Sequence, residues 1–189
     1  MSKKIFLTVF LSLLLSVNFV LGQDKVLIGL GGGGSKPTGD GSEYWNMGFN
    51  IHGEIFADIT KDMSLGYRAA YNNWSVNSNK FRYDVSATTS IWELCPSIRF
   101  LPSSHKEQQT YCFGQIGAGL YIINVDVDLP YYPSEYITDC RFGINFGMGI
   151  MVDSRVLIFP MYNIIFTEQK TTNYFTLNLG ITFNSHTQW

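Results

Sequence analysis

The chain has 189 residues and a formal net charge of −2, and only 15% of its residues are charged, against about 25% in an average soluble domain. Apolar residues make up 46% and aromatic residues 15% of the chain, which also holds 18 glycines. The length fits one domain, and this composition excludes a basic nucleic-acid binder, a disordered tail and a helical repeat array.

The first 22 residues have the composition of a secretory signal peptide. Lys3 and Lys4 precede an apolar run from Ile5 to Leu21, and small residues close the segment before Gln23. We therefore expect cleavage after Gly22 and a mature domain over residues 23–189. A transmembrane anchor is the alternative, but the run is at the short end of the about 20 residues that a span needs, and no basic cluster follows it.

Apolar and polar residues alternate along most of the mature chain, which predicts β-strands with one face of each kind. In the clearest case Phe49 and Ile51 alternate with Asn50 and His52. Pro160 interrupts one strand and suggests a bulge or a local break there. In chain order, the predicted strands are 26–33, 45–60, 64–76, 83–101, 110–128, 136–152, 155–167 and 173–183.

The connections between these strands alternate in length. Those after the second, fourth and sixth strands are 61–63, 102–109 and 153–154, and those after the odd strands are 34–43, 77–82, 130–134 and 168–172. Short turns at one end and mostly longer loops at the other are typical of outer-membrane barrels. The predicted fold is all-β: a membrane-spanning, antiparallel up-and-down barrel of eight strands.

The polar face of the strands carries too few charges for a solvated exterior, so we assign it to the lumen. There, buried acids and bases need one another as partners. The apolar face would be an aggregation surface in water and is assigned to lipid. The predicted polar network of the lumen comprises His52, Glu54, Asp58, Arg68, Glu93, Arg99, Asp139, Arg141 and Arg155.

Together, the signal peptide, the eight alternating segments and the closing aromatic strand resemble the small outer-membrane β-barrels of Gram-negative bacteria, of the OmpX and OmpA-transmembrane-domain type. The resemblance implies a location in the outer membrane, contact with its lipid, and recognition of the last strand by the barrel-assembly machinery. The apolar residues of that strand are Phe175, Leu177, Leu179, Ile181 and Phe183. This chain departs from the pattern by continuing from Asn184 to Trp189.

No motif in the sequence predicts a catalytic, cofactor or metal site. The glycine-rich run Gly29–Lys36 has the wrong spacing for a phosphate-binding loop, and Pro37 stands where Ser or Thr would bind magnesium. Cys95, Cys112 and Cys140 are an odd number in an exported chain, and we expect three free thiols with Cys95 facing inward.

We therefore predict a monomeric, non-enzymatic barrel with a structural or surface-interaction role, bound through its extracellular loops to an outside ligand or cell surface and not to nucleic acid. An eight-stranded barrel is too narrow for a general porin. A lipid A-modifying hydrolase and a secreted lipocalin-like barrel are the alternatives. Aromatic and amide residues near the loop rim form either a partner site or an interfacial girdle: Asn72, Asn73, Trp74, Tyr131, Tyr132 and Tyr136.

Overall fold

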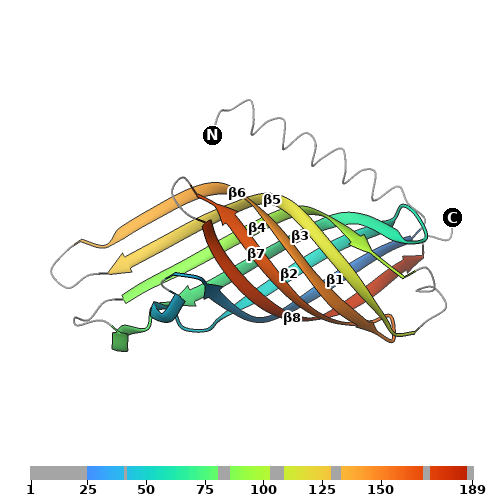
Figure 1. Ribbon diagram of the computed structural model, residues 1–189, viewed down its shortest axis with the longest axis horizontal. Coiled ribbons are helices and arrows are strands. Elements are labelled where there is room, and N and C mark those ends of the chain that lie inside the picture. The colour runs from blue at the N-terminus through green and yellow to red at the C-terminus, as the bar shows by residue number, and fades with distance from the viewer. Residues whose placement is uncertain are drawn as a thin grey trace, which may run out of the picture.

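Eight antiparallel strands close into one barrel in the computed structural model, each pairing with the next in the chain and β1 with β8 (Figure 1). The structure describes residues 25–40, 42–80, 86–102, 109–128, 133–167 and 171–186, so the expected signal peptide lies outside the described residues. The predicted fold class is confirmed. The strands are β1 (Lys25–Thr38), β2 (Gly48–Asp58), β3 (Met63–Ser75), β4 (Ser86–Phe100), β5 (Tyr111–Asp128), β6 (Glu135–Val152), β7 (Val156–Phe166) and β8 (Thr171–His186).

Two short 3-10 turns accompany the strands, η1 over Ser42–Tyr44 and η2 over Ser78–Lys80. η1 shortens the predicted second strand, because the chain is still turning at Tyr44 and Trp45 makes only an isolated bridge to Val76. β2 therefore starts at Gly48 and not at Trp45. Within the described residues, none of the helical segments is long and apolar enough to span a membrane.

β1 is longer than predicted: it continues past Gly33 to Thr38 and so includes the part of the glycine-rich run, from Gly34 to Lys36, that we expected in a loop. A Cβ atom at Gly33 would lie 1.8 Å from the carbonyl oxygen of Leu177 in β8, and one at Gly31 would lie 2.4 Å from that of Leu179. These glycines let β8 approach β1 closely enough for the ladder to continue to Thr38.

β8 is also longer than predicted. It continues past Phe183 through Asn184 to His186, which pairs with Lys25 at the start of β1. The described chain therefore begins and ends at the same end of the barrel, the end with the short turns, as an even number of strands requires.

Pro160 produces a local break and not a bulge. The β6–β7 ladder pairs Gly147 with Met161 and resumes at Ile150 with Ile158 in the same register. No residue is therefore inserted in either strand. Proline has no amide hydrogen to give to a neighbouring strand, which explains why the ladder is interrupted beside it.

The two ends of the barrel differ. At the loop end, β6 and its hairpin partner β5 extend past β7, as seen at the left of Figure 1. The first pairing of β6 with β7 is Gly143 with Ile165, so the segment from Glu135 to Phe142 is paired with β5 alone among the described strands.

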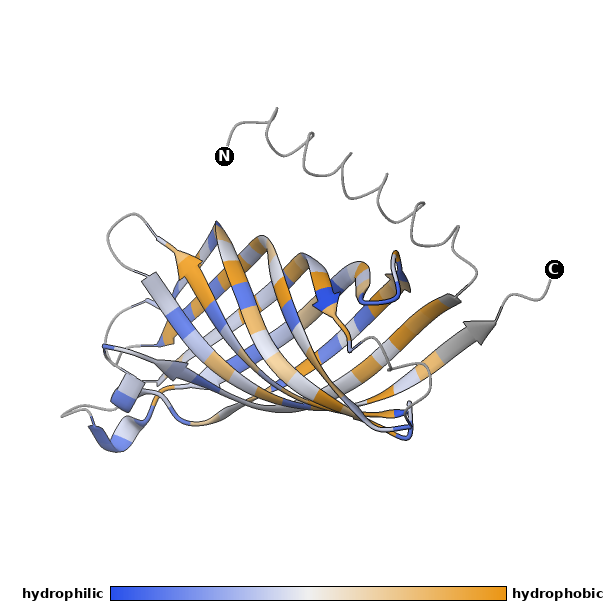
Figure 2. Ribbon diagram, turned by 45° about the vertical axis from the view of Figure 1, so that its right-hand side comes forward, coloured by the Kyte–Doolittle hydropathy of each residue, from blue (hydrophilic) through white to orange (hydrophobic). Residues whose placement is uncertain are grey.

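Hydrophobic and hydrophilic residues alternate along the strands in Figure 2, and burial follows the same alternation. In β8, Leu177 and Leu179 are 50% and 60% exposed on the outer surface, whereas Thr176 and Asn178 are buried in the lumen. The exterior of the barrel is apolar and its interior holds the polar side chains, the reverse of a soluble barrel.

Candidate functional site

Four charged side chains meet in the middle of the lumen. They come from the inward, polar faces of three strands: Glu54 from β2, Arg68 from β3, and Glu93 and Arg99 from β4. None of these side chains is more than 3% exposed. Nη2 of Arg99 lies 2.7 Å from Oε1 of Glu54, Nη1 of Arg68 lies 3.8 Å from Oε2 of Glu54, and Nε of Arg68 lies 3.5 Å from Oε1 of Glu93. Two acids and two bases thus form a neutral set, which we call the charged layer.

Arg99 has the most complete surroundings of the four. Besides its bond to Glu54, it donates hydrogen bonds from Nη2 and Nε to Oε1 of Gln115, at 2.9 and 3.2 Å. Its guanidinium also lies 4.0 Å from the ring centre of Phe56 and 4.4 Å from that of Phe113. The cation is therefore held by hydrogen bonds in its plane and by two aromatic faces.

Uncharged side chains complete the hydrogen bonding of the charged layer. Asn145 Nδ2 donates to Oε1 of Glu93 at 2.8 Å, and the Tyr174 hydroxyl donates to Oε2 of Glu93 at 3.3 Å. Nη2 of Arg68 donates to Oδ1 of Asn178 at 3.1 Å. These three residues were not among the predicted network, which was drawn from ionisable side chains, although each lies on the same inward face as its charged neighbours.

The other residues of the predicted network lie elsewhere. His52 is buried on the inward face of β2, and neither ring nitrogen has a hydrogen-bond partner among the described residues. Asp58 accepts a hydrogen bond from Ser64 near the turn end. Asp139 and Arg141 form a partly exposed ion pair with each other near the loop end, because the projecting hairpin carries them past the filled lumen.

Arg155 was wrongly placed on the inward face. It is exposed in the β6–β7 turn, where Asp153 and Ser154 adopt φ values of 51° and 53° and reverse the chain before β7 starts at Val156. The two-residue period no longer applies in such a turn.

Apolar side chains fill the lumen on both sides of the charged layer. On the loop side, the buried cluster consists of Trp74, Ile91, Cys95, Tyr121, Ile165 and Tyr174. On the turn side, it consists of Phe113, Met151, Leu157, Phe159 and Met161. Trp74 packs edge-on against Tyr174 with 5.1 Å between ring centroids and is 2% exposed, so it does not belong to an interfacial girdle. Tyr131 and Tyr132 lie outside the described residues.

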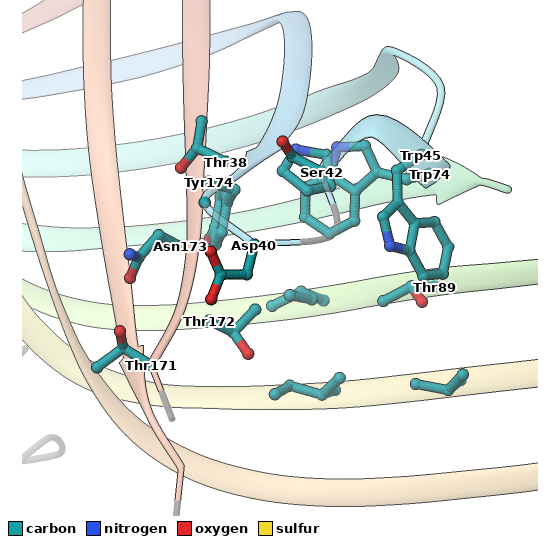
Figure 3. A pocket seen from close by; sticks show the side chains of 15 residues that line it. Thr38, Asp40, Ser42, Trp45, Trp74, Thr89, Thr171, Thr172, Asn173 and Tyr174 are labelled. Carbon is teal, nitrogen blue, oxygen red and sulfur yellow. The ribbon is translucent and has the colours of Figure 1, made fainter. Parts of the chain in front are cut away.

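A cavity of about 700 Å³ opens above the loop-side cluster (Figure 3). We call it the rim pocket. Its walls come from β1 and the following loop, β4, β5 and β8, and Trp74 and Tyr174 belong both to its lining and to the cluster below. The lining residues are Pro37, Thr38, Gly39, Asp40, Ser42, Trp45, Trp74, Thr89, Ile91, Ile123, Val125, Thr171, Thr172, Asn173 and Tyr174.

The three cysteines are free thiols, with Cys95 buried in the lumen and Cys112 and Cys140 exposed on the outer surface. In the described part of the chain, no three His, Cys, Asp or Glu side chains are grouped closely enough to hold a metal ion.

No family model matches the sequence, and neither does any curated protein. Solved structures do match. The attachment invasion locus protein Ail of Yersinia pestis, in complex with the heparin analogue sucrose octasulfate, has a TM-score of 0.57 at 14% identity, over 85% of this chain and 99% of Ail. The outer membrane protein OprG of Pseudomonas aeruginosa has a TM-score of 0.52 at 10% identity, over 85% of this chain and 96% of OprG.

A major outer membrane protein of Thermus thermophilus has a TM-score of 0.51 at 8% identity, over 85% of this chain and 99% of that chain. At these identities the likeness shows the fold. Together with the closed barrel of eight antiparallel strands, it establishes that this chain has the fold of an outer-membrane β-barrel protein.

Proposed function

We propose that this protein is a monomeric outer-membrane barrel without catalytic activity, which acts at the cell surface through its loop end. The observation that carries the proposal is the apolar outer surface. Leu177, Leu179, Ile181 and Phe183 of β8 are each at least half exposed. A continuous surface of this kind is stable only where lipid covers it.

The filled lumen supports a surface role over transport. The two apolar clusters and the charged layer between them occupy the interior with fully buried side chains, such as Tyr121 and Phe159 at 0% exposure. A barrel of this size has room for its own side chains or one small ligand. We therefore expect no ohmic conductance when the protein is inserted in a planar bilayer.

The two alternative functions have less support. A secreted lipocalin-like barrel needs a polar exterior and a lumen open to an apolar ligand, whereas here the exterior is apolar and the lumen is filled by its own side chains and a charged layer. A lipid A hydrolase needs its acid–base group at the boundary with lipid. His52 is 5% exposed and faces the lumen, away from any lipid substrate.

The loop end is the part of the molecule that would meet an outside ligand. Ail was solved with a heparin analogue, which is a polyanion. Among the described residues that line the rim pocket, Asp40 is the only charged one, and none is Lys or Arg. This pocket is therefore poorly suited to a polyanion, and its partner belongs to another chemical class.

The N-terminal segment would direct export of the protein, and the last strand would direct its assembly into the membrane. We propose removal of residues 1–22 on export and recognition of β8, with its outward residues Phe175 and Phe183, by the barrel-assembly machinery. N-terminal sequencing of the mature protein is expected to begin at Gln23.

Cell fractionation tests the proposed function. The full chain, expressed in a Gram-negative host, is expected in the outer-membrane fraction, with folded and boiled samples migrating differently on a denaturing gel. Lipid A profiles with and without the gene are expected to be identical. Recovery in a detergent-free supernatant would contradict the membrane location, and an altered acyl pattern would favour the hydrolase.

A further inference from the structure

We propose that the rim pocket is a binding site for an uncharged saccharide. The proposal rests on the proposed function in one respect, namely that the loop end faces the outside of the cell. The cavity of about 700 Å³ lies within the range of about 300–1,000 Å³ that is usual for small-molecule sites.

The aromatic side chains of the pocket suit the apolar side of a sugar. Trp45 enters from the segment after η1 and packs against the buried cluster that contains Trp74 and Tyr174, and all three side chains border the same space in Figure 3. The C–H groups on one face of a sugar ring form an apolar surface that packs on aromatic rings. Trp45 is only partly buried, so its ring is available for such a contact.

One buried polar atom of the lining lacks a partner. The indole Nε1 of Trp74 makes no hydrogen bond within the described part of the protein. Trp74 is 2% exposed, so its donor cannot turn to bulk water. The indole N–H is a donor only, and a sugar hydroxyl can accept its hydrogen bond. Buried polar groups without partners are rare and costly, which favours a ligand that satisfies them.

The remaining polar side chains of the pocket are mainly hydroxyls. Thr171 and Thr172 line it near Asp40 (Figure 3), whereas the Thr38 hydroxyl donates to the Tyr162 hydroxyl at 3.2 Å. Hydroxyls both donate to and accept from a polyhydroxylated ligand, and a carboxylate accepts strongly from two adjacent sugar hydroxyls.

The single charged residue of the described lining disfavours anionic sugars. Asp40 lies in its lining, and Asp126, Asp128 and Glu135 are exposed at the loop end of the β5–β6 hairpin. Lys36 of β1 lies on the outward face, since it is exposed next to the buried Ser35. An organic cation would find acceptors and aromatic rings here, but it would leave the Trp74 donor without a partner.

The test uses the full mature chain in nanodiscs of phosphatidylethanolamine and phosphatidylglycerol, prepared without glycoside detergents because these would compete for the pocket. A glycan array with neutral, sulfated and sialylated oligosaccharides is read first. The best neutral glycan is then titrated by calorimetry, beside sucrose octasulfate and choline. We expect neutral glycans to bind, and we expect neither sucrose octasulfate nor choline to do so.

Variants then test whether the glycan binds in the rim pocket. Trp45→Ala is expected to weaken binding about tenfold, corresponding to 1.4 kcal/mol. The matched control is Tyr136→Ala. Tyr136 is 68% exposed at the same end of the barrel but is not part of the pocket lining. The affinity of this variant for the glycan should equal that of the unmodified protein. Trp45→Phe keeps an aromatic surface and should retain most of the affinity.

Several results would overturn the proposal: no neutral glycan bound on the array, binding of choline or sucrose octasulfate alone, or neutral binding that is unchanged in Trp45→Ala. Heat-modifiable migration of each variant shows that it has folded. The binding measurement is made in nanodiscs, so its failure is distinct from a failure of the outer-membrane location, which fractionation alone decides.

Discussion

Arg99 is the residue whose removal best tests the arrangement of the lumen. It makes one hydrogen bond to Glu54 and two to Gln115, and it lies between the rings of Phe56 and Phe113. Arg99→Met keeps much of the side-chain volume and the contact with the two rings, but it removes the charge and all three hydrogen bonds.

The variant leaves Glu54 buried at 0% side-chain exposure with Arg68 as its remaining counter-ion, 3.8 Å away. Removing one partner of a buried ion pair typically costs about 3–5 kcal/mol, because the other charge is left uncompensated. Stabilities of folded domains are about 5–15 kcal/mol. We therefore expect Arg99→Met to lower the free energy of unfolding by about 3–5 kcal/mol.

The measurement is urea unfolding of the protein in phospholipid vesicles, followed by tryptophan fluorescence and by the folded band on an unboiled gel. Arg141→Met is the matched control. It breaks the ion pair with Asp139, whose side chains are 27% and 42% exposed, so we expect a loss of less than about 1 kcal/mol. Adding Glu54→Gln to Arg99→Met should recover part of the loss. Equal losses for Arg99→Met and Arg141→Met would refute the argument.

The remaining predictions concern the outer face, the β1–β8 contact and the thiols. Leu179→Lys should cost about 2–4 kcal/mol in the same unfolding assay if this 60% exposed side chain lies at mid-bilayer; a change near zero would mean that it does not face lipid. Gly33→Ala should cost about 1–3 kcal/mol, because its Cβ would lie 1.8 Å from a backbone oxygen, whereas Gly114→Ala meets nothing within 4 Å and should be neutral. A lipid-soluble maleimide should modify Cys112 in the folded barrel but Cys95 only after unfolding, and modification of Cys95 without unfolding would show that the lumen opens.

The strands were predictable because a barrel in a membrane imposes a two-residue period along its whole length. In β2, Phe49 and Ile51 were assigned outward and His52 and Glu54 inward, and the burial of these residues follows that phase. The ends of the strands were not predictable in this way. β1 continues past its predicted end at Gly33 to Thr38, because it stays paired with β8, a strand about 140 residues away in the sequence.

The centre of the lumen was predictable only in part. Charged residues on the inward phase had to find partners, so an ion-pair network was expected. Which charges meet depends on the stagger of the strands, and Asp139 and Arg141 fall outside the charged layer because their hairpin projects. Of the residues that line the rim pocket, only Trp74 was singled out from the sequence as a candidate partner residue. Trp45, Trp74 and Tyr174 come from separate segments and share a cavity only once the barrel closes.

The scarcity of charge in this chain concerns both the outside and the inside of the barrel. The exterior is apolar and carries few charges. The buried interior needs only as many charges as it can pair, and the charged layer is a neutral set of two acids and two bases. Asp40 and the acidic residues of the β5–β6 hairpin lie outside that balanced set, at the loop end. The charge in the lining of the rim pocket, that of Asp40, is therefore independent of the ion pairs that stabilise the lumen. Arg99→Met should consequently lower stability without changing the charge preference of the rim pocket.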